Sequence, residues 1–221
     1  MDPLSIIASM ISIIGDITTK YKTIDNTANL PKAFEEVKRS LPIVEGIFFG
    51  MKERLRKRNL LDEQSQAILN GIKPCEDKIK ELKSVIDVVK TEFEADQHAG
   101  EWARVRHAYY KALGRVKALG VESLMKDILK GLKKLAQVQV FELVTQDDLK
   151  AIENALEKLE SVESSLEVSE LDSTGNNYAS QSVAANGTGH QYNTQGGAVF
   201  NGSNNINAPG GGSYHFNMGK A

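Results

Sequence analysis

An apolar residue returns at every third or fourth position through most of the first 170 residues. That spacing places apolar side chains on one face of an α-helix and predicts a helix wherever it continues. No alternation of apolar and polar residues long enough for a strand occurs before residue 173. The pattern therefore predicts an all-α fold, a bundle of about five helices, over residues 1–172.

Start signals place the first two helices. Asp2 followed by Pro3 is a capping residue with proline at the first helical position, and it predicts a helix that runs to about residue 28. Pro31 opens a second helix with an apolar residue at each turn. Pro42 lies inside that pattern and predicts a kink.

Three further helices follow in the same way. Asp62 caps the third, and Pro74 interrupts its first half. The fourth is predicted as one helix over residues 102–135, because its apolar periodicity continues throughout. Thr145 and Asp148 have the spacing of a capping box and open the last helix.

The composition changes abruptly after residue 172. Residues 173–221 hold ten of the 18 glycines, nine asparagines and a single charged side chain, Lys220. Uncharged tails of this kind, dotted with aromatic residues, are disordered as monomers and prone to cross-β stacking. The chain is thus predicted to consist of a helical domain, 1–172, and an amyloid-forming tail, 173–221. A flexible linker without further function is the alternative.

The first helix opens with an uncharged stretch, PLSIIASMISIIG, at residues 3–15. Thirteen helical residues span about 20 Å, which is short of the roughly 30 Å hydrocarbon core of a bilayer. Two interpretations stay open: the helix is a buried part of the bundle, or it leaves the bundle and enters a membrane when several copies assemble. The candidate membrane-targeting residues are Leu4, Ile6, Ile7, Met10, Ile11, Ile13 and Ile14.

A second candidate membrane contact is a cluster of basic residues, which is either an ordinary exposed helix end or a site for anionic lipid. The cluster comprises Lys52, Arg54, Arg56, Lys57 and Arg58.

Catalytic and metal-binding patterns are missing from the sequence. There is no phosphate-binding P-loop, and the four histidines lack the spacing of metal ligands. Cys75, the single cysteine, is predicted to be a packed thiol. A net charge of −2 argues against nucleic acid as a partner. We expect a protein that is not an enzyme and that has no catalytic residues, no cofactor and no metal site.

Both ends of the chain resemble known families. The opening MDPLSIIASMISIIGDITTKYKTI, followed by LPKAFEEVKRSLPIVEG, resembles the helical domains called HeLo-like or SesA-like. These occur on fungal NOD-like receptors and in the stand-alone effectors that such receptors control. The tail segment GHQYNTQGGAVFNG resembles the fungal PP amyloid motif, with a core at about 187–203. The residues that fit the motif are Gln191, Asn193, Gln195, Gly196, Gly197, Phe200 and Asn201.

The resemblance implies a cell-death executioner of the kind that acts in fungal innate immunity and heterokaryon incompatibility. Such a protein would be cytoplasmic at rest and would form a homo-oligomer through its amyloid tail, templated by a NOD-like receptor with a similar motif. It would then move to the plasma membrane and contact its lipids. The alternative is a helical signalling adaptor, or a regulatory domain of a receptor, that never enters a membrane.

Overall fold

The computed structural model describes residues 2–25, 27–95, 102–137, 142–166, 199–200 and 206–207. The chain divides into two compact units, Met1–Thr174 and Gly175–Ala221.

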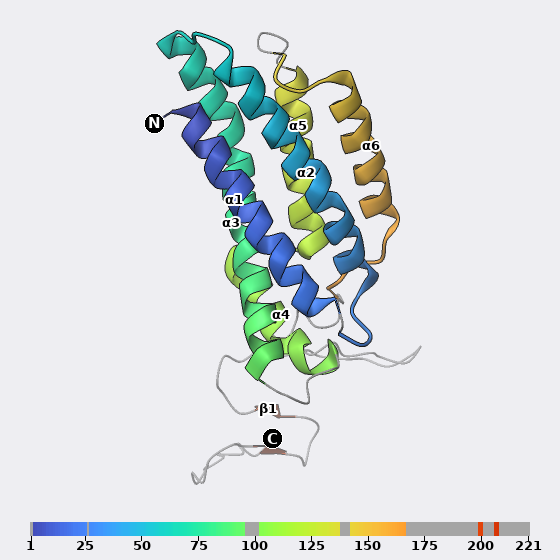
Figure 1. Cartoon of the computed structure of the whole chain (residues 1–221). Coiled ribbons are helices and arrows are strands. Elements are labelled where there is room, and N and C mark those ends of the chain that lie inside the picture. The colour runs from blue at the N-terminus through green and yellow to red at the C-terminus, as the bar shows by residue number, and fades with distance from the viewer. Residues whose placement is uncertain are drawn as a thin grey trace, which may run out of the picture. The chain divides into compact units, whose positions relative to one another are not determined.

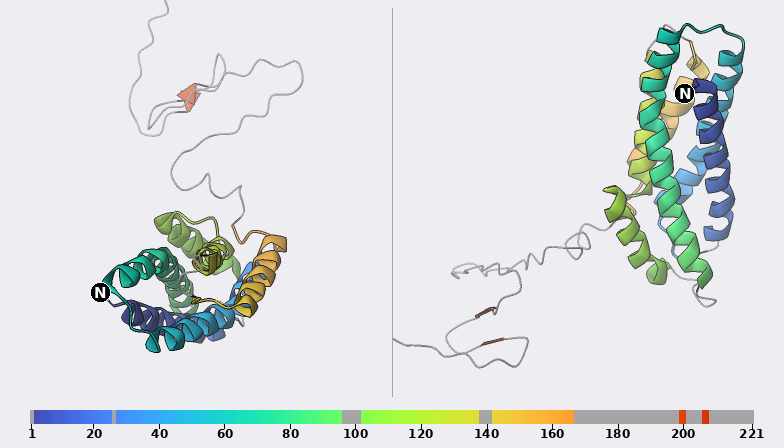
Figure 2. Two further views of the ribbon diagram at one scale, coloured as in Figure 1. Left: turned by 90° about the horizontal axis from the view of Figure 1, so that it is seen from above. Right: turned by 90° about the vertical axis from the view of Figure 1, so that its left-hand side faces the viewer.

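The first unit is a helical bundle, and the all-α prediction is confirmed. Five elongated helices lie side by side, and the shorter α4 lies at one end of the bundle (Figures 1 and 2). The helices of the described residues are α1 (Pro3–Ile24), α2 (Lys32–Arg56), α3 (Asp62–Ala95), α4 (Trp102–Val116), α5 (Val121–Gln137) and α6 (Gln146–Ser161).

The fourth predicted helix is in fact two helices, α4 and α5. The break lies at residues 117–120, where Lys117 and Gly120 have φ angles of 53° and 147°. Such left-handed backbone ends a right-handed helix, and glycine adopts it without a steric penalty. A Cβ atom at Gly120 would also lie 2.2 Å from Oε1 of Glu122. The apolar periodicity continues across the break because both helices bury one face in the same core.

Two other helix boundaries differ from the prediction. The first helix ends at Ile24 rather than near residue 28, and the third continues through Pro74 without interruption. Proline removes one hydrogen bond from a helix. Here Pro74 and Asn70, whose carbonyl loses its partner, are both exposed, so that water can reach the freed carbonyl.

The predicted caps of the first and last helices are confirmed, whereas Asp62, predicted to cap the third, is itself the first residue of α3. The side chain of Asp2 accepts a hydrogen bond from the backbone N–H of Leu4 at 3.2 Å, and Pro3 follows it. At the start of α6, the backbone N–H of Asp148 donates to Thr145 Oγ1 at 3.1 Å, while that of Thr145 donates to Asp148 Oδ2 at 2.9 Å. These reciprocal bonds satisfy two backbone donors that the helix itself cannot pair.

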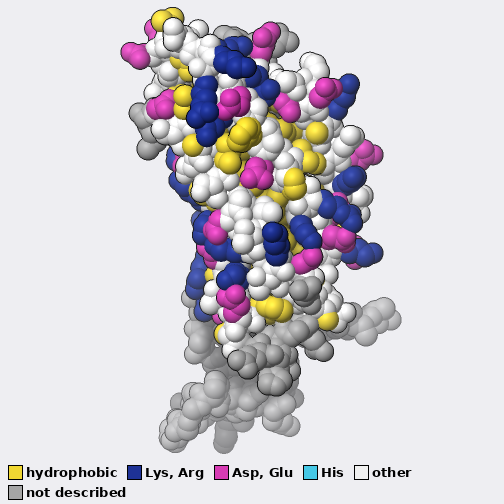
Figure 3. All heavy atoms as spheres, viewed as in Figure 1, with side chains coloured by type: hydrophobic (Ala, Val, Ile, Leu, Met, Phe, Trp, Pro, Cys, Tyr) yellow, Lys and Arg dark blue, Asp and Glu magenta, His cyan; other side chains and the backbone are white. Residues whose placement is uncertain are grey.

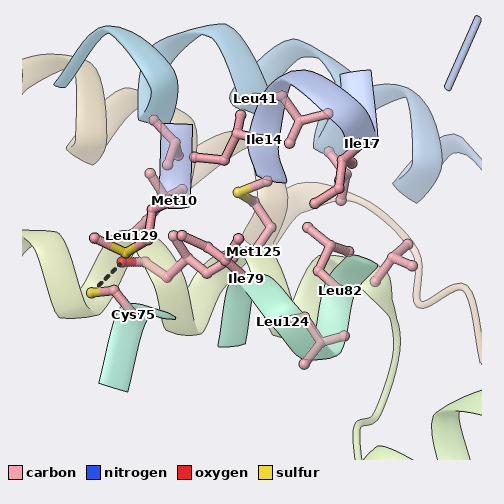
Figure 4. Packing of buried hydrophobic residues seen from close by; sticks show 14 of the residues in the cluster. Met10, Ile14, Ile17, Leu41, Cys75, Ile79, Leu82, Leu124, Met125 and Leu129 are labelled. Atoms are coloured by element: carbon pink, nitrogen blue, oxygen red, sulfur yellow. Dashed lines mark hydrogen bonds between the residues drawn. The ribbon is translucent and has the colours of Figure 1, made fainter. Parts of the chain in front are cut away.

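The core lies around α3, which packs against α1, α4 and α5. Figure 4 shows α1 residues such as Met10 and Ile14 meeting Ile79 of α3 and Leu129 of α5. The contact between α3 and α5 is close, since a Cβ atom at Gly131 would lie only 2.5 Å from the Sγ atom of Cys75.

In the second unit, the described residues form two short strands, β1 (Val199–Phe200) and β2 (Ile206–Asn207). They pair antiparallel, with Val199 opposite Asn207 and Phe200 opposite Ile206. Of the predicted amyloid-motif residues, Phe200 lies in β1. The other six lie outside the described residues, namely Gln191, Asn193, Gln195, Gly196, Gly197 and Asn201.

Candidate functional site

The first helix is the most apolar surface element of the bundle. Within the described part of the chain, α1 is the one helix whose length and composition suit a membrane crossing. Its 22 residues span about 33 Å, longer than the 13-residue uncharged stretch considered from the sequence. Core helices of soluble proteins meet the same criterion, so the surroundings of α1 decide what it does at rest.

One face of α1 is buried in the bundle against α2 and α3. Ile7 and Met10 are fully buried, and Ile6 and Ile14 nearly so. Three other predicted membrane-targeting residues, Leu4, Ile11 and Ile13, are partly buried and pack against the same core. Each fully buried aliphatic side chain contributes about 1.5–3 kcal/mol. The hydrophobic effect therefore holds α1 firmly on the bundle.

The opposite face of α1 carries small polar residues. Ser5, Ser9 and Ser12 are exposed and follow one stripe along the helix. Figure 3 shows the face of the molecule that α1 and α2 form, where apolar side chains come to the surface among interspersed charges. Among the exposed hydrophobic residues that the structure describes, the largest is Phe49 of α2, which is 55% exposed. Because Ser5, Ser9 and Ser12 are exposed, substitutions on this stripe should not disturb the core.

Four charged residues join the second half of α1 to α3. Lys20 Nζ lies 2.6 Å from Asp16 Oδ2 and 2.5 Å from Asp87 Oδ1. Lys83 Nζ lies 2.6 Å from Asp87 Oδ2 and 3.2 Å from Asp16 Oδ2. We call these four residues the charge square. The ammonium groups of Lys20 and Lys83 lower the pKa of Asp16, and the neighbouring carboxylates, that of Asp87 foremost, raise the pKa of Lys83.

The C-terminal end of α1 meets an aromatic cluster. The ring of Tyr21 lies 6.2 Å from that of Phe34, which packs 5.1 Å from Trp102 and 5.2 Å from Tyr109 of α4. The Tyr21 side chain is fully buried, but its hydroxyl has no hydrogen-bond partner among the described residues. Burial raises its pKa well above the ordinary value. A buried hydroxyl without a hydrogen-bond partner costs free energy, so this contact stabilises the packing of α1 less than a phenylalanine ring would.

The predicted basic cluster does not form one free cationic patch. Arg54 donates to the carbonyl oxygen of Leu143 at 2.9 Å and to Asp148 Oδ2 at 3.1 Å, and so connects α2 to the start of α6. Arg56 pairs with Glu53 at 3.1 Å, and Arg58 with Glu142 at 3.6 Å. Lys57 is exposed and Lys52 is partly buried. Arg54 therefore serves a contact between two helices, whereas the Arg56 and Arg58 side chains are exposed.

Glu122 is a buried carboxylate that the sequence did not indicate, and it lies near Tyr109 of the aromatic cluster. Glu122, in the first turn of α5, is 4% exposed. Its Oε1 accepts hydrogen bonds from the backbone N–H of Ser165 at 3.2 Å and from Ser164 Oγ at 3.1 Å, and its Oε2 accepts one from Ser165 Oγ at 2.5 Å. The Tyr109 hydroxyl lies 2.5 Å from Ser165 Oγ and accepts from the Val121 N–H. A single glutamate two residues after a glycine does not indicate, from the sequence alone, that its side chain is buried and hydrogen-bonded.

The cysteine is a packed thiol, as predicted. Cys75 is buried, and its Sγ points to the carbonyl oxygen of Ile128 at 3.8 Å (Figure 4). Burial raises the pKa of the thiol to about 12, so that it is protonated at neutral pH. Among the residues that the structure describes, no group of three or more His, Cys, Asp or Glu side chains is arranged to hold a metal ion.

The fold and these features define a helical-bundle domain with an apolar N-terminal helix that packs on the outside of α2 and α3. Residues 7–135 match the SesA family, described as an N-terminal domain on NACHT NTPases and P-loop NTPases. The match covers more than half of the chain, from α1 to most of α5, and the protein therefore belongs to the SesA family. Neither curated proteins nor solved structures gave a match.

Proposed function

We propose that this protein is a membrane-targeting executioner of programmed cell death, activated when a NOD-like receptor templates its C-terminal tail. The observation that carries the proposal is α1, a helix of membrane-spanning length that the resting bundle buries on one face. Its exposed face bears only small polar groups in its first half, at Ser5, Ser9 and Ser12. A helix of this kind can pack closely against copies of itself in lipid.

The tail would supply the trigger. Its lack of charge favours in-register stacking of identical chains, because like charges would repel at the roughly 4.8 Å spacing of stacked strands. The antiparallel pairing of β1 with β2 supports a tendency of this segment to form strands. A receptor with a similar motif would provide the first stack, and the growing fibril would bring many bundles together.

Family membership supports a partner of the NOD-like receptor type, since SesA is described as an N-terminal domain on NACHT NTPases. A HeLo-like domain followed directly by a PP-like tail is the architecture of the fungal executioner HELLP, which this chain resembles. The protein would remain in the cytoplasm at rest and move to the plasma membrane once activated. No enzymatic step and no cofactor is part of this proposal.

Dye release from liposomes tests the proposal. The full chain is added to anionic vesicles with or without preformed fibrils of a peptide spanning residues 173–221. We expect release only when fibrils are present. The control is the same peptide carrying Gly196→Pro, which removes a backbone donor from the stack and is expected to slow fibril formation. No release in the presence of fibrils that demonstrably incorporate the full chain would contradict the proposal.

A second candidate function is that of a signalling adaptor whose bundle binds a partner domain. The engagement of Arg54 between α2 and α6 favours it, because this cation is less available to anionic lipid than the sequence indicated. A regulatory domain of a receptor is a related alternative, given the NTPases on which the family occurs. Neither would release dye from vesicles under any of the conditions above.

A further inference from the structure

The charge square has an arrangement that distinguishes it from the other contacts of α1. It consists of two pairs within helices, Asp16–Lys20 on α1 and Lys83–Asp87 on α3, each four residues apart and 2.6 Å long. Two cross-helix contacts join these pairs, Lys20–Asp87 at 2.5 Å and Lys83–Asp16 at 3.2 Å. Positive and negative groups thus alternate around the square.

Separation of α1 from α3 breaks only the cross-helix contacts. Asp16 keeps Lys20 as its partner on α1, and Lys83 keeps Asp87 on α3, because residues four apart are neighbours on any α-helix. Arg54 offers the contrast: its acidic partner Asp148 is on another helix, and their separation would leave both groups without the contact they have now. An uncompensated charge is costly wherever water is scarce.

The same pairing matters for the destination of α1. Asp16 lies 13 residues after Pro3, about 20 Å along the helix, and a lone carboxylate at that depth opposes insertion into lipid. The pair with Lys20 neutralises this carboxylate, and the remaining charge, Lys22, lies in the last turn of the helix. The charged half of α1 therefore does not bar the helix from a membrane as strictly as its composition indicates.

We propose that Asp16, Lys20, Lys83 and Asp87 form a latch that fixes α1 on α3 and opens without leaving any of the four charges unpaired. The role of the opened helix rests on the function proposed above, whereas the latch itself does not. Apolar burial supplies most of the attachment of α1. The latch sets the register of α1 on α3 and adds a contribution that ionic strength can reduce.

Inversion of one intrahelical pair tests this arrangement. The variant D16K/K20D keeps the net charge, the composition and a pair within α1, but turns both cross-helix contacts into repulsions. The variant K83D/D87K does the same from α3. The combination of all four substitutions restores alternating charges around the square. The readout is amide hydrogen exchange of the peptides that cover α1 in the full chain, without membranes.

Each double variant should speed the exchange of α1. Partly exposed ion pairs change an equilibrium by a factor of about 1.4–5 each, so the two cross-helix contacts together predict a rise of roughly two- to twenty-fivefold. The variant with all four substitutions should return the exchange rate of α1 close to that of the original chain. The coupling energy between the two substituted pairs, obtained from all four proteins, excludes the local effects of reversing each pair on its own helix.

The matched control inverts Lys90 and Glu94, a pair four residues apart on α3 at 2.9 Å that is not part of the square. The exchange of α1 should not change in K90E/E94K. The latch is refuted if the variant with all four substitutions exchanges as fast as the double variants, or if neither double variant differs from the original chain. These outcomes involve no lipid, so failure of the latch and failure of the membrane function are distinguished by dye release from the same proteins.

Discussion

Glu122 and Ser165, 43 residues apart in the sequence, are joined by two hydrogen bonds in the interior of the bundle. The carboxylate lies in the first turn of α5, where the helix dipole favours a negative charge. Ser165 follows α6 and is among the last residues of the bundle that the structure describes. The pair therefore fixes the end of the helical domain to α5, just before the composition of the chain changes.

Loss of the carboxylate should destabilise the bundle. Glu122→Ala leaves the Ser165 N–H and hydroxyl without their acceptor, and hydrogen bonds to a charged group contribute about 1.5–3 kcal/mol. We expect the free energy of unfolding in urea to fall by at least about 2 kcal/mol. Glu160→Ala, at an exposed position on α6, should change it by less than about 0.5 kcal/mol. Equal effects of the two substitutions would contradict the role of Glu122.

The same contact fixes where the domain can be cut. A fragment of residues 1–172 contains Ser165 and should be helical, soluble and cooperative in its thermal unfolding. A fragment of residues 1–163 lacks the serine partners of Glu122 and should melt at a lower temperature. Identical melting temperatures would show that the segment after α6 contributes nothing to the bundle.

Removal of the unpaired hydroxyl on α1 should stabilise the protein. The hydroxyl of Tyr21 is buried without a partner, so Tyr21→Phe keeps the ring contact with Phe34 and removes a desolvated polar group. The free energy of unfolding should rise by about 1 kcal/mol. Tyr109→Phe is the matched control, because its hydroxyl contacts Ser165 and Val121 and its loss should destabilise. A loss of stability in Tyr21→Phe would mean that this hydroxyl has a partner.

Two glycines in helices should respond oppositely to alanine. A methyl group at Gly131 would lie 2.5 Å from Sγ of the buried Cys75, and overpacking of this kind costs about 1–3 kcal/mol. Nothing lies within 4 Å of the corresponding position at Gly46, where alanine should stabilise α2 by up to about 1 kcal/mol. Chemical denaturation measures both. If Cys75→Ala does not reduce the cost of Gly131→Ala, the close approach of α3 and α5 is wrong.

Acid should weaken the charge square, and Asp16 should account for part of the effect. The pKa of Asp16 is lowered from its ordinary value of 3.8, chiefly by Lys20, so its ion pairs stabilise the fold above that value. The contribution is lost as the pH falls through the lowered pKa of the folded state. Stability should therefore decline as the pH falls below about 3.8, and the decline should be smaller in Asp16→Asn. The same decline in both proteins would exclude a role for Asp16.

Much of the bundle could be predicted because apolar periodicity and helix caps are local signals. Asp2, Thr145 and Asp148 mark helix starts within three residues of the groups that they cap. The break before Gly120 was missed because the periodic pattern continues across it, and only the backbone angle identifies it.

For the candidate site, the sequence predicts which residues are buried but not which helices their side chains contact. The burial of Ile7 and Met10 follows from their place on the apolar face. The contacts of Lys20 with Asp87, 67 residues apart, and of Arg54 with Asp148, 94 residues apart, depend on which helices become neighbours. No local pattern contains that information.

The central claim is that α1 enters the membrane, and a charge on its exposed stripe tests it. Lysine at Ile7 or Ile14 would be buried in the resting bundle and would unfold it, whereas Ser9 is exposed in the middle of the apolar stretch. Ser9→Lys should leave the melting temperature nearly unchanged, yet it would place a charge within the membrane, at a cost that rises to about 2.5–3.5 kcal/mol at the centre of a membrane helix. Ser84→Lys, at an exposed position on α3, is the control.

The decisive measurement is the rate of dye release from anionic liposomes by the full chain with preformed tail fibrils. We predict that Ser9→Lys abolishes release, while Ser84→Lys releases dye at the original rate and both variants join the fibrils equally. Release by a folded Ser9→Lys protein at the rate of the original chain would contradict the entry of α1 into the membrane.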